Sequence, residues 1–93
     1  MKHYVIAKFK EDTDWHCLVQ PVRSLFEQTL SIRGVHAVNV QPSCSERAGR
    51  YHLMIEIDME PGALPVYDGC DAHRVWKEAY GPLLESKAIF DCD

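Results

Sequence analysis

The segment from Tyr51 to Met59 constrains the fold most, because apolar side chains occupy every second position in it. The apolar set is Tyr51, Leu53, Ile55, Ile57 and Met59, and the intervening set is His52, Met54, Glu56 and Asp58. A period of two is typical of a β-strand with one buried face and does not match the 3.6-residue period of an α-helix. The chain must therefore contain a sheet with a covered face.

Three other segments are predicted to be strands of this sheet. His3 to Phe9 alternates in the same way, with His3 on the same side as Phe9. Val35 to Val40 and Lys87 to Cys92 are short and rich in strand-forming residues. A polar segment from Gln41 to Gly49 predicts a loop between the second and third strands.

A first helix is predicted to begin after Thr13 or Asp14, both good N-cap residues. Residues at helical spacing follow, namely Leu18, Val22, Leu25, Thr29 and Ile32. Pro21 lies inside this segment and lacks an N–H group, so either the first turns are separate or the helix kinks there. Gly34 follows Arg33 and predicts a left-handed end of the helix.

The second helical region is predicted in two pieces. A short piece from Ala63 to Asp68 ends at Gly69, and Asp71 is the expected N-cap of a longer helix. A broad apolar stripe follows, interrupted near its end by Gly81-Pro82; it consists of Ala72, Val75, Trp76, Ala79, Tyr80 and Leu83.

The order of elements is therefore β-α-β-β-α-β, which predicts an α+β, ferredoxin-like sandwich. A chain of 93 residues has room for one domain, expected to span residues 1–93. The helices of such a fold cover one face of the sheet. The other face would carry several apolar side chains, namely Tyr4, Ile6, Met54, Ala88 and Phe90. This predicts a two-fold homodimer that buries the helix-free faces together.

Charge and hydropathy exclude two classes of partner. Ten Lys and Arg against fourteen Asp and Glu leave a net charge of −4, so nucleic acid is not an expected partner. Lys2, Lys8 and Lys10 interrupt the first residues, and no apolar run approaches the ~20 residues that span a bilayer. We therefore expect neither a signal peptide nor a membrane anchor, and a cytoplasmic location.

The cysteines are widely spaced and do not form the close pairs of zinc or redox motifs; they are Cys17, Cys44, Cys70 and Cys92. In a reducing compartment they are expected to be free thiols. A weaker alternative is a metal site at Cys70 and His73, completed by His52 or His36. We expect no metal and no cofactor.

Several segments resemble the stress-responsive A/B barrel family. They are Lys2 to Asp12, Asp71-Ala72-His73, Pro82 to Glu85 and Ile89-Phe90-Asp91. The resemblance runs from the first strand to the last and implies a dimeric α+β barrel. Most members of the family have no established activity. Its best-defined enzymes are plant polyketide cyclases, which close a linear poly-β-ketone by aldol chemistry without metal or cofactor.

The resemblance to these cyclases implies a catalytic site at His3, Tyr67 and His73. His73 would act as the base, Tyr67 as the donor to an enolate oxygen, and His3 as the group that orients or assists them. Strand phase turns His3 inward, and His73 flanks the apolar stripe at a helix start. Tyr67 can approach His73 only if the helix breaks at Gly69. The alternative is that the two histidines are structural and that Tyr67 is an amphipathic boundary residue.

The sequence therefore predicts a small dimeric protein that binds a small, partly apolar molecule. If the His/Tyr site is catalytic, the protein is expected to be a cofactor-free cyclase, lyase or isomerase. A non-catalytic stress-response or assembly protein is the alternative from another class. A cofactor-independent oxygenase is a further alternative, by analogy of fold alone. Glu56 and Asp58 share one face of a strand and resemble an acid-base pair, but they are better interpreted as a solvated or interface-facing pair.

Overall fold

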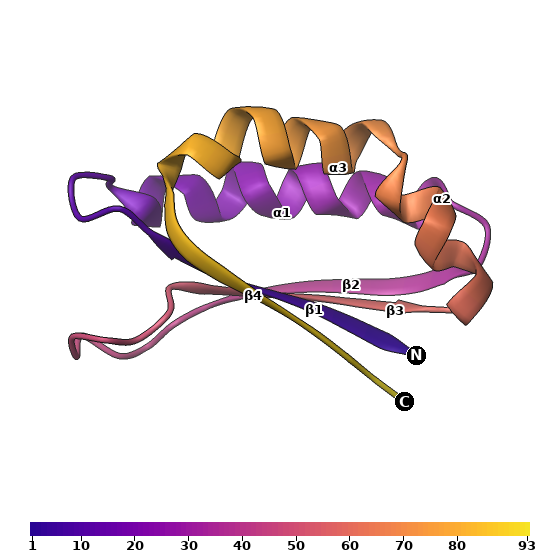
Figure 1. Cartoon of the computed structure of the whole chain (residues 1–93), viewed down its shortest axis with the longest axis horizontal. Helices are drawn as coiled ribbons and strands as arrows, with labels where there is room; N and C mark the ends of the chain where they lie inside the picture. The colour runs from indigo at the N-terminus through magenta and orange to yellow at the C-terminus, as the bar shows by residue number, and fades with distance from the viewer.

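The computed structural model describes residues 1–93 and contains one four-stranded sheet with its helices on one face (Figure 1). The strands are β1 (Lys2–Phe9), β2 (Val35–Pro42), β3 (Leu53–Met59) and β4 (Leu84–Cys92). The helices are α1 (Val19–Glu27), α2 (Leu64–Asp68) and α3 (Asp71–Val75). The predicted ferredoxin-like α+β fold is confirmed.

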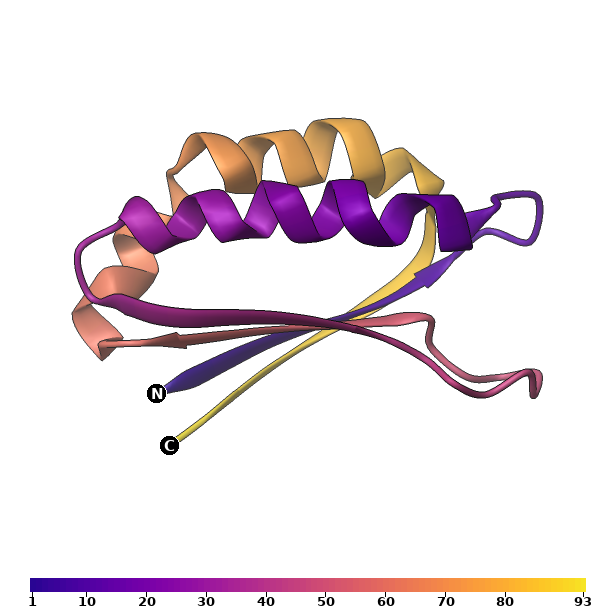
Figure 2. The ribbon, with the colours of Figure 1, turned by 180° about the vertical axis from the view of Figure 1, so that it is seen from behind.

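The sheet has the strand order β2-β3-β1-β4, and each neighbouring pair is antiparallel. β1 is therefore central, and the two ends of the chain lie side by side, with Lys2 opposite Cys92 (Figure 2). The four predicted strands are present with shifted ends. β3 begins after Tyr51, and β4 begins at Leu84, three residues before the predicted start at Lys87.

The first helical region resolves the alternative that Pro21 left open. A separate 3₁₀ turn (Trp15–Leu18) precedes α1, and a second one (Gln28–Ser31) follows it. Pro21 is the third residue of α1, where its missing N–H group would have no partner within the helix. Asp14 precedes the first turn as predicted but does not cap it, because its carboxylate accepts the Cys17 thiol at 3.2 Å instead. The helical residues end at Ser31, and the following Ile32 is extended rather than left-handed. Gly34, with φ +95°, lies in the turn that leads into β2, so the predicted left-handed end of the helix is wrong.

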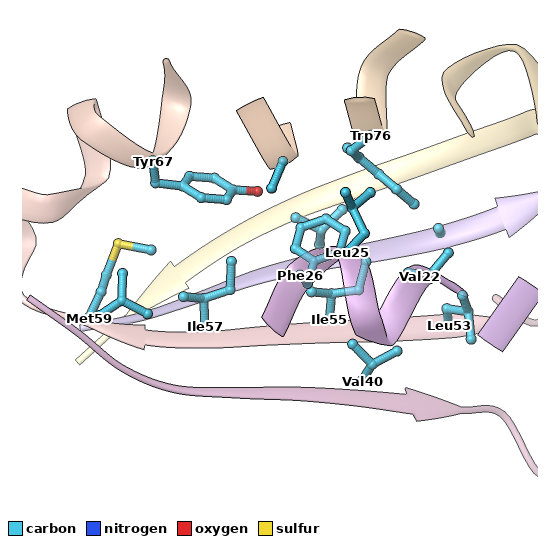
Figure 3. Close-up of a cluster of buried hydrophobic side chains, with 14 of the residues drawn as sticks. Val22, Leu25, Phe26, Val40, Leu53, Ile55, Ile57, Met59, Tyr67 and Trp76 are labelled. Carbon is cyan, nitrogen blue, oxygen red and sulfur yellow. The ribbon is translucent and has the colours of Figure 1, made fainter. Parts of the chain in front are cut away.

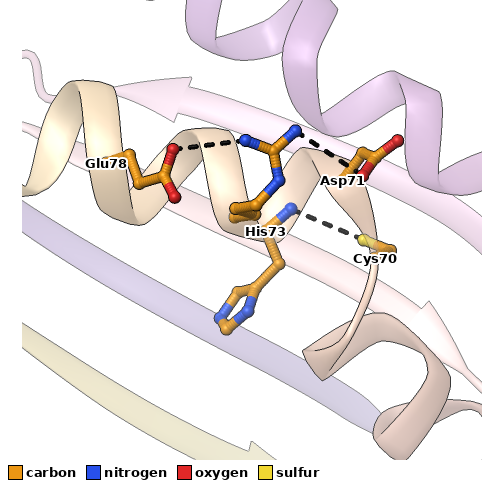
Figure 4. A network of polar contacts seen from close by, with 5 residues as sticks. Cys70, Asp71, His73 and Glu78 are labelled. Carbon is orange, nitrogen blue, oxygen red and sulfur yellow. Dashed lines mark hydrogen bonds and ion pairs between the residues drawn. The ribbon is translucent and has the colours of Figure 1, made fainter.

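The N-cap of α3 corrects a sequence prediction. Cys70, rather than Asp71, holds the cap position, and its Sγ accepts the backbone N–H of His73 at 3.5 Å (Figure 4). Asp71 is the first residue of α3, and its carboxylate lies 3.6 Å from the guanidinium of Arg74. A thiol can take the cap position because its sulfur is a weak hydrogen-bond acceptor.

The apolar stripe after Cys70 also differs from the prediction. α3 continues as a π-helical turn (Trp76–Tyr80) and then as a 3₁₀ turn (Gly81–Leu83). A π-helix has more residues per turn than an α-helix, so each residue rotates by a smaller angle about the helix axis. Side chains after Trp76 therefore no longer fall on the predicted apolar stripe. Trp76 is buried as expected, whereas Ala79 is exposed.

The core lies between the helical layer and the facing side of the sheet (Figure 3). The inward positions of β1 and β3 supply most of its floor, namely Val5, Ala7, Phe9, Leu53, Ile55, Ile57 and Met59. Trp76 and Tyr67 are its largest fully buried side chains, and Trp76 meets Phe26 of α1 edge to face with ring centroids 5.3 Å apart. This packing fixes the end of the core where the candidate site lies.

The opposite face of the sheet carries no helix and remains apolar in part. Phe90 is 60% exposed, and its ring lies 6.4 Å from that of Tyr4 on β1. Ile6, Met54 and Ala88 lie on the same face and are half-buried. None of the helices has the length and apolar character that crossing a bilayer requires.

Candidate functional site

His3 faces the helical layer, as its strand phase predicts, and is 6% exposed. Its Nδ1 lies 2.5 Å from Oδ1 of Asp91, the residue opposite it on β4. An ionised carboxylate can only accept, so Nδ1–H of His3 donates this bond. In the neutral ring the lone pair is consequently at Nε2, and Asp91 fixes both the tautomer and the orientation of the imidazole.

Tyr67, near the end of α2, is fully buried. Its ring lies edge-on to that of His3, with centroids 5.3 Å apart. Its hydroxyl is the one buried side-chain oxygen or nitrogen in the chain without a hydrogen-bond partner. Burial, with smaller contributions from the nearby charges of Cys70 and Asp68, raises the pKa of Tyr67 well above its ordinary value. The hydroxyl therefore keeps its proton and can donate a hydrogen bond to a ligand.

The chain between α2 and α3 brings Tyr67 and His73 together. α2 is followed by Gly69, after which Cys70 takes an extended conformation and α3 begins in a new direction. The rings of Tyr67 and His73 lie with centroids 4.9 Å apart. The expected break at Gly69 is thus present, and the approach that depended on it occurs.

His73 is held at both its backbone and its ring. The backbone N–H donates to Cys70, and the ring Nδ1 lies 2.8 Å from the carbonyl oxygen of Asp68. Because a carbonyl oxygen accepts, Nδ1–H of His73 is the donor, and the lone pair of the neutral ring is at Nε2. Figure 4 shows the imidazole leaving α3 on the side of the sheet. This is the arrangement of a positioned proton acceptor.

His3, Tyr67 and His73 line one cavity of about 220 Å³. Its remaining lining is apolar at Val5, Trp76 and Ile89 and charged at Asp68, Lys77 and Lys87. The volume is below the roughly 300–1,000 Å³ of pockets for drug-sized ligands, so it suits a small molecule or one end of a larger one. The structure therefore brings all the sequence-predicted site residues together.

Four charged residues of this site escaped the sequence analysis, namely Asp68, Lys77, Lys87 and Asp91. Asp91 had no predicted role because its contact with His3 depends on the pairing of the first strand with the last. The available signal was positional, since both residues lie near the chain ends that such pairing would bring together. Lys77 and Lys87 are isolated lysines in the sequence, and only the fold places them at one cavity.

Of the residues of the alternative metal site, Cys70 and His73 are neighbours, but neither His36 nor His52 joins them. No group of three or more His, Cys, Asp or Glu side chains lies close enough together to hold a metal ion. His36 pairs with Glu60 at 3.0 Å. His52 stacks on Trp15, and its Nδ1 accepts the backbone N–H of Phe9 at 3.0 Å. Desolvation, followed by the charge of Lys8, lowers the pKa of His52.

Comparisons with known proteins identify the fold. No protein-family model matches the chain, and no curated protein sequence matches it. A dimeric protein of unknown function with a ferredoxin-like fold from Bacteroides fragilis has a TM-score of 0.81 at 13% identity, covering 99% of this chain and 93% of that one. A DABB family protein with a ferredoxin-like fold from Mesorhizobium loti has a TM-score of 0.67 at 18% identity, covering 99% and 93%.

An enzyme is also among the structures with this fold. A hydroxynitrile lyase from Passiflora edulis has a TM-score of 0.72 at 9% identity, covering 96% of this chain and 87% of the lyase. At such identities the likeness establishes a shared ferredoxin-like α+β fold.

Proposed function

We propose that the chain is a single-domain member of the stress-responsive A/B barrel family that catalyses cofactor-free proton transfer on a small carbonyl compound. One observation carries the proposal: His3, Tyr67 and His73 come from three separate elements and line one cavity. A buried donor without a partner and a histidine with a free Nε2 lone pair are the two groups that enolate chemistry requires.

In the proposed reaction, Nε2 of His73 removes a proton from the carbon beside a carbonyl group. The electron pair of the broken C–H bond forms a C=C bond while the π pair of the carbonyl group moves to its oxygen, and the Tyr67 hydroxyl donates a hydrogen bond to the resulting enolate. In an aldol step the enolate carbon forms a bond to a second carbonyl carbon, and the new alkoxide takes the proton back from His73. The reverse sequence breaks the same C–C bond, which gives a lyase.

The Asp91–His3 pair has a positioning role in this proposal. His3 packs edge-on to Tyr67, and Asp91 holds the His3 ring in one tautomer. The pair therefore restricts where the Tyr67 ring can lie relative to His73. A donor held in one position stabilises the enolate more than a mobile donor does, because no reorganisation is needed when charge develops on the substrate oxygen.

The test is hydrogen exchange of 1-phenylpropan-2-one in D₂O, followed by loss of its methylene signal in the NMR spectrum. The protein should accelerate this exchange above the buffer rate. His73→Ala should lower the catalysed rate by about 10²–10⁴-fold, as expected for loss of a general base. Tyr67→Phe should lower it by about 10²–10³-fold, as expected for loss of an oxyanion donor.

His36→Ala is the matched control, because His36 is an exposed histidine paired with Glu60 and does not line the cavity. It should exchange the ketone at the wild-type rate. The proposal fails if wild type and His73→Ala exchange the ketone equally fast, or if His36→Ala loses as much activity as His73→Ala.

We also propose that the protein is a homodimer with the helix-free sheet faces together, which makes it a dimeric α+β barrel. Phe90, Tyr4 and Ile6 supply exposed or half-exposed apolar surface on that face. The protein of the same fold from Bacteroides fragilis is described as dimeric, which supports the proposal. Burial of such a face against a second copy would remove apolar surface from water.

Light scattering tests the dimer. At micromolar concentration the wild type should have twice the mass of the 10.7 kDa chain. Ile6→Asp should give a monomer, because an unpaired carboxylate in a buried interface is costly. The matched control is Ser24→Asp, which adds the same charge at an exposed residue of α1, in the helical layer and away from this face. A wild-type monomer, or a dimer that Ile6→Asp leaves intact, would contradict the proposal.

A non-catalytic binding protein is the second candidate, and one observation favours it. Tyr67 is completely buried, so its hydroxyl is closed to solvent in this conformation. A ligand must shift the neighbouring side chains to reach it. The exchange assay separates the candidates, because a protein that only binds the ketone leaves its exchange at the buffer rate.

A further inference from the structure

Two lysines stand at the candidate site without an ionic partner. Lys77 comes from the π turn of the helical layer, and Lys87 comes from β4, so they approach the cavity from opposite walls. The ion pairs of the chain involve Lys8, Arg74 and three histidines, but neither of these two lysines. In a chain with net charge −4, two unpaired cations at one small cavity form a local positive rim.

One carboxylate lies among the residues that line the cavity. Asp68 is this residue, and it has no ionic partner. Asp91 does not line the cavity, because it lies beside the His3 ring and accepts its Nδ1–H. Within the lining itself, two cations therefore stand against one carboxylate.

The fold keeps both lysines available to a ligand. Lys87 is opposite Ala7 of β1, whose side chain is buried beneath the helices, so Lys87 belongs to the helix-facing side of β4. Lys77 belongs to the helical layer and is exposed. A dimer formed through the other face of the sheet would leave both of them uncovered.

From this placement we infer that the substrate is an oxo-carboxylate, with its carbonyl group at Tyr67 and His73 and its carboxylate between Lys77 and Lys87. The inference rests on the proposed function and adds the class of substrate. The apolar lining from Val5, Trp76 and Ile89 suits the carbon skeleton between the two polar ends.

The test compares two probes, 4-oxo-4-phenylbutanoate and its methyl ester, which lacks the negative charge and carries one additional methyl group. Exposed ion pairs are worth about 0.2–1 kcal/mol each, so two lysines should make the acid bind roughly fivefold more tightly than the ester. NMR titration of the protein at low ionic strength measures both dissociation constants. Added salt should reduce the preference, because exposed charges are screened.

The variants are Lys77→Met, Lys87→Met and the double substitution, which keep most of the length of each side chain but remove its charge. Each single change should lose part of the preference for the acid, and the double change should abolish it while the affinity for the ester stays the same. Lys10→Met is the matched control, because Lys10 is an exposed lysine that does not line the cavity. It should retain the full preference.

The inference is overturned if wild type binds the acid no more tightly than the ester, or if the preference survives in the double variant. Exchange of the methylene protons beside the ketone separates this failure from failure of the proposed function. Catalysed exchange of the ester without any preference for the acid would overturn the lysine inference alone. A lysine-dependent preference for the acid without catalysed exchange would overturn the proposed catalysis and leave an anion-binding site.

Discussion

Replacing Tyr67 by Phe is expected to stabilise the fold while it weakens the site. The Tyr67 hydroxyl is buried without a hydrogen-bond partner. Burying a polar group in this way costs about 1–3 kcal/mol in proteins, because its bonds to water are lost and not replaced. Phe keeps the aromatic ring and its contacts with His3 and His73. The free energy of unfolding should therefore rise by about 1–3 kcal/mol.

Thermal unfolding followed by circular dichroism measures this change. For a domain of this size each kcal/mol shifts the midpoint temperature by roughly 4–8 °C. All samples must have the same protein concentration, since the stability of a dimer depends on it. Tyr51→Phe is the matched control: Tyr51 is 38% exposed, and its hydroxyl can bond to water. This control should change the stability by no more than about 0.5 kcal/mol.

A lower midpoint temperature for Tyr67→Phe than for wild type would refute the reasoning, because it would mean that the hydroxyl has a stabilising partner in solution. The same variant should exchange 1-phenylpropan-2-one more slowly than wild type. A gain in stability together with a loss of activity is the expected signature of a polar group that is kept for a ligand rather than for the fold.

Three further predictions concern the rest of the chain. Gly34→Ala should lower the free energy of unfolding more than Gly49→Ala in urea titrations: both have positive φ, +95° and +80°, but only at Gly34 would a Cβ lie 3.2 Å from the Cβ of Ala63. Equal losses would contradict this. The pKa of His52 is lowered from 6.5 in the folded state, so the unfolded chain takes up its proton first as the pH falls. The free energy of unfolding should keep its full value above about pH 6.5 and decrease as the pH falls below it. If His52→Gln leaves this pH profile unchanged, His52 is not the cause of the decrease. Finally, four thiols should react with Ellman's reagent in unfolded, unreduced protein, since all four cysteines are free in the structure; a lower number would indicate a disulfide.

The strands and their inward faces could be predicted because each depends on a local pattern. The alternation in β3 places Leu53, Ile55 and Ile57 in the core, as expected. The positive φ of Gly34 is local too, because few residues other than glycine adopt it, although it occurs in the turn before β2 and not at the helix end, which lies at Ser31. Such features need no knowledge of the rest of the fold.

The errors occur where packing between elements decides the local geometry. Ala79 was expected in the core on the assumption of a uniform 100° step per residue, and the π turn that begins at Trp76 breaks that assumption. Trp76 is wedged between Phe26 and Tyr80, with ring centroids 5.3 and 5.6 Å away, and neither contact is visible in a helical periodicity. The cap at Cys70 was missed because Asp71 is the more common capping residue.

For the candidate site too, the residues could be predicted from the sequence but their contacts could not. His3, Tyr67 and His73 could be named from strand phase, a helix break and a family resemblance. Their contacts to Asp91 and to the Asp68 carbonyl depend on strand register and on the turn between α2 and α3. These contacts determine which nitrogen of each histidine carries the lone pair, so the chemical part of the site emerges only from the structure.

A crystal structure of the protein with 1-phenylpropan-2-one bound is the most direct test of the central claim that these residues form one site for a carbonyl compound. We predict the ketone oxygen at about 2.7–3.1 Å from the Tyr67 hydroxyl, the usual range for an oxyanion donor, with the methylene carbon facing Nε2 of His73. A ketone bound elsewhere, with the Tyr67 hydroxyl still unpartnered or bonded to another protein group, would contradict the claim.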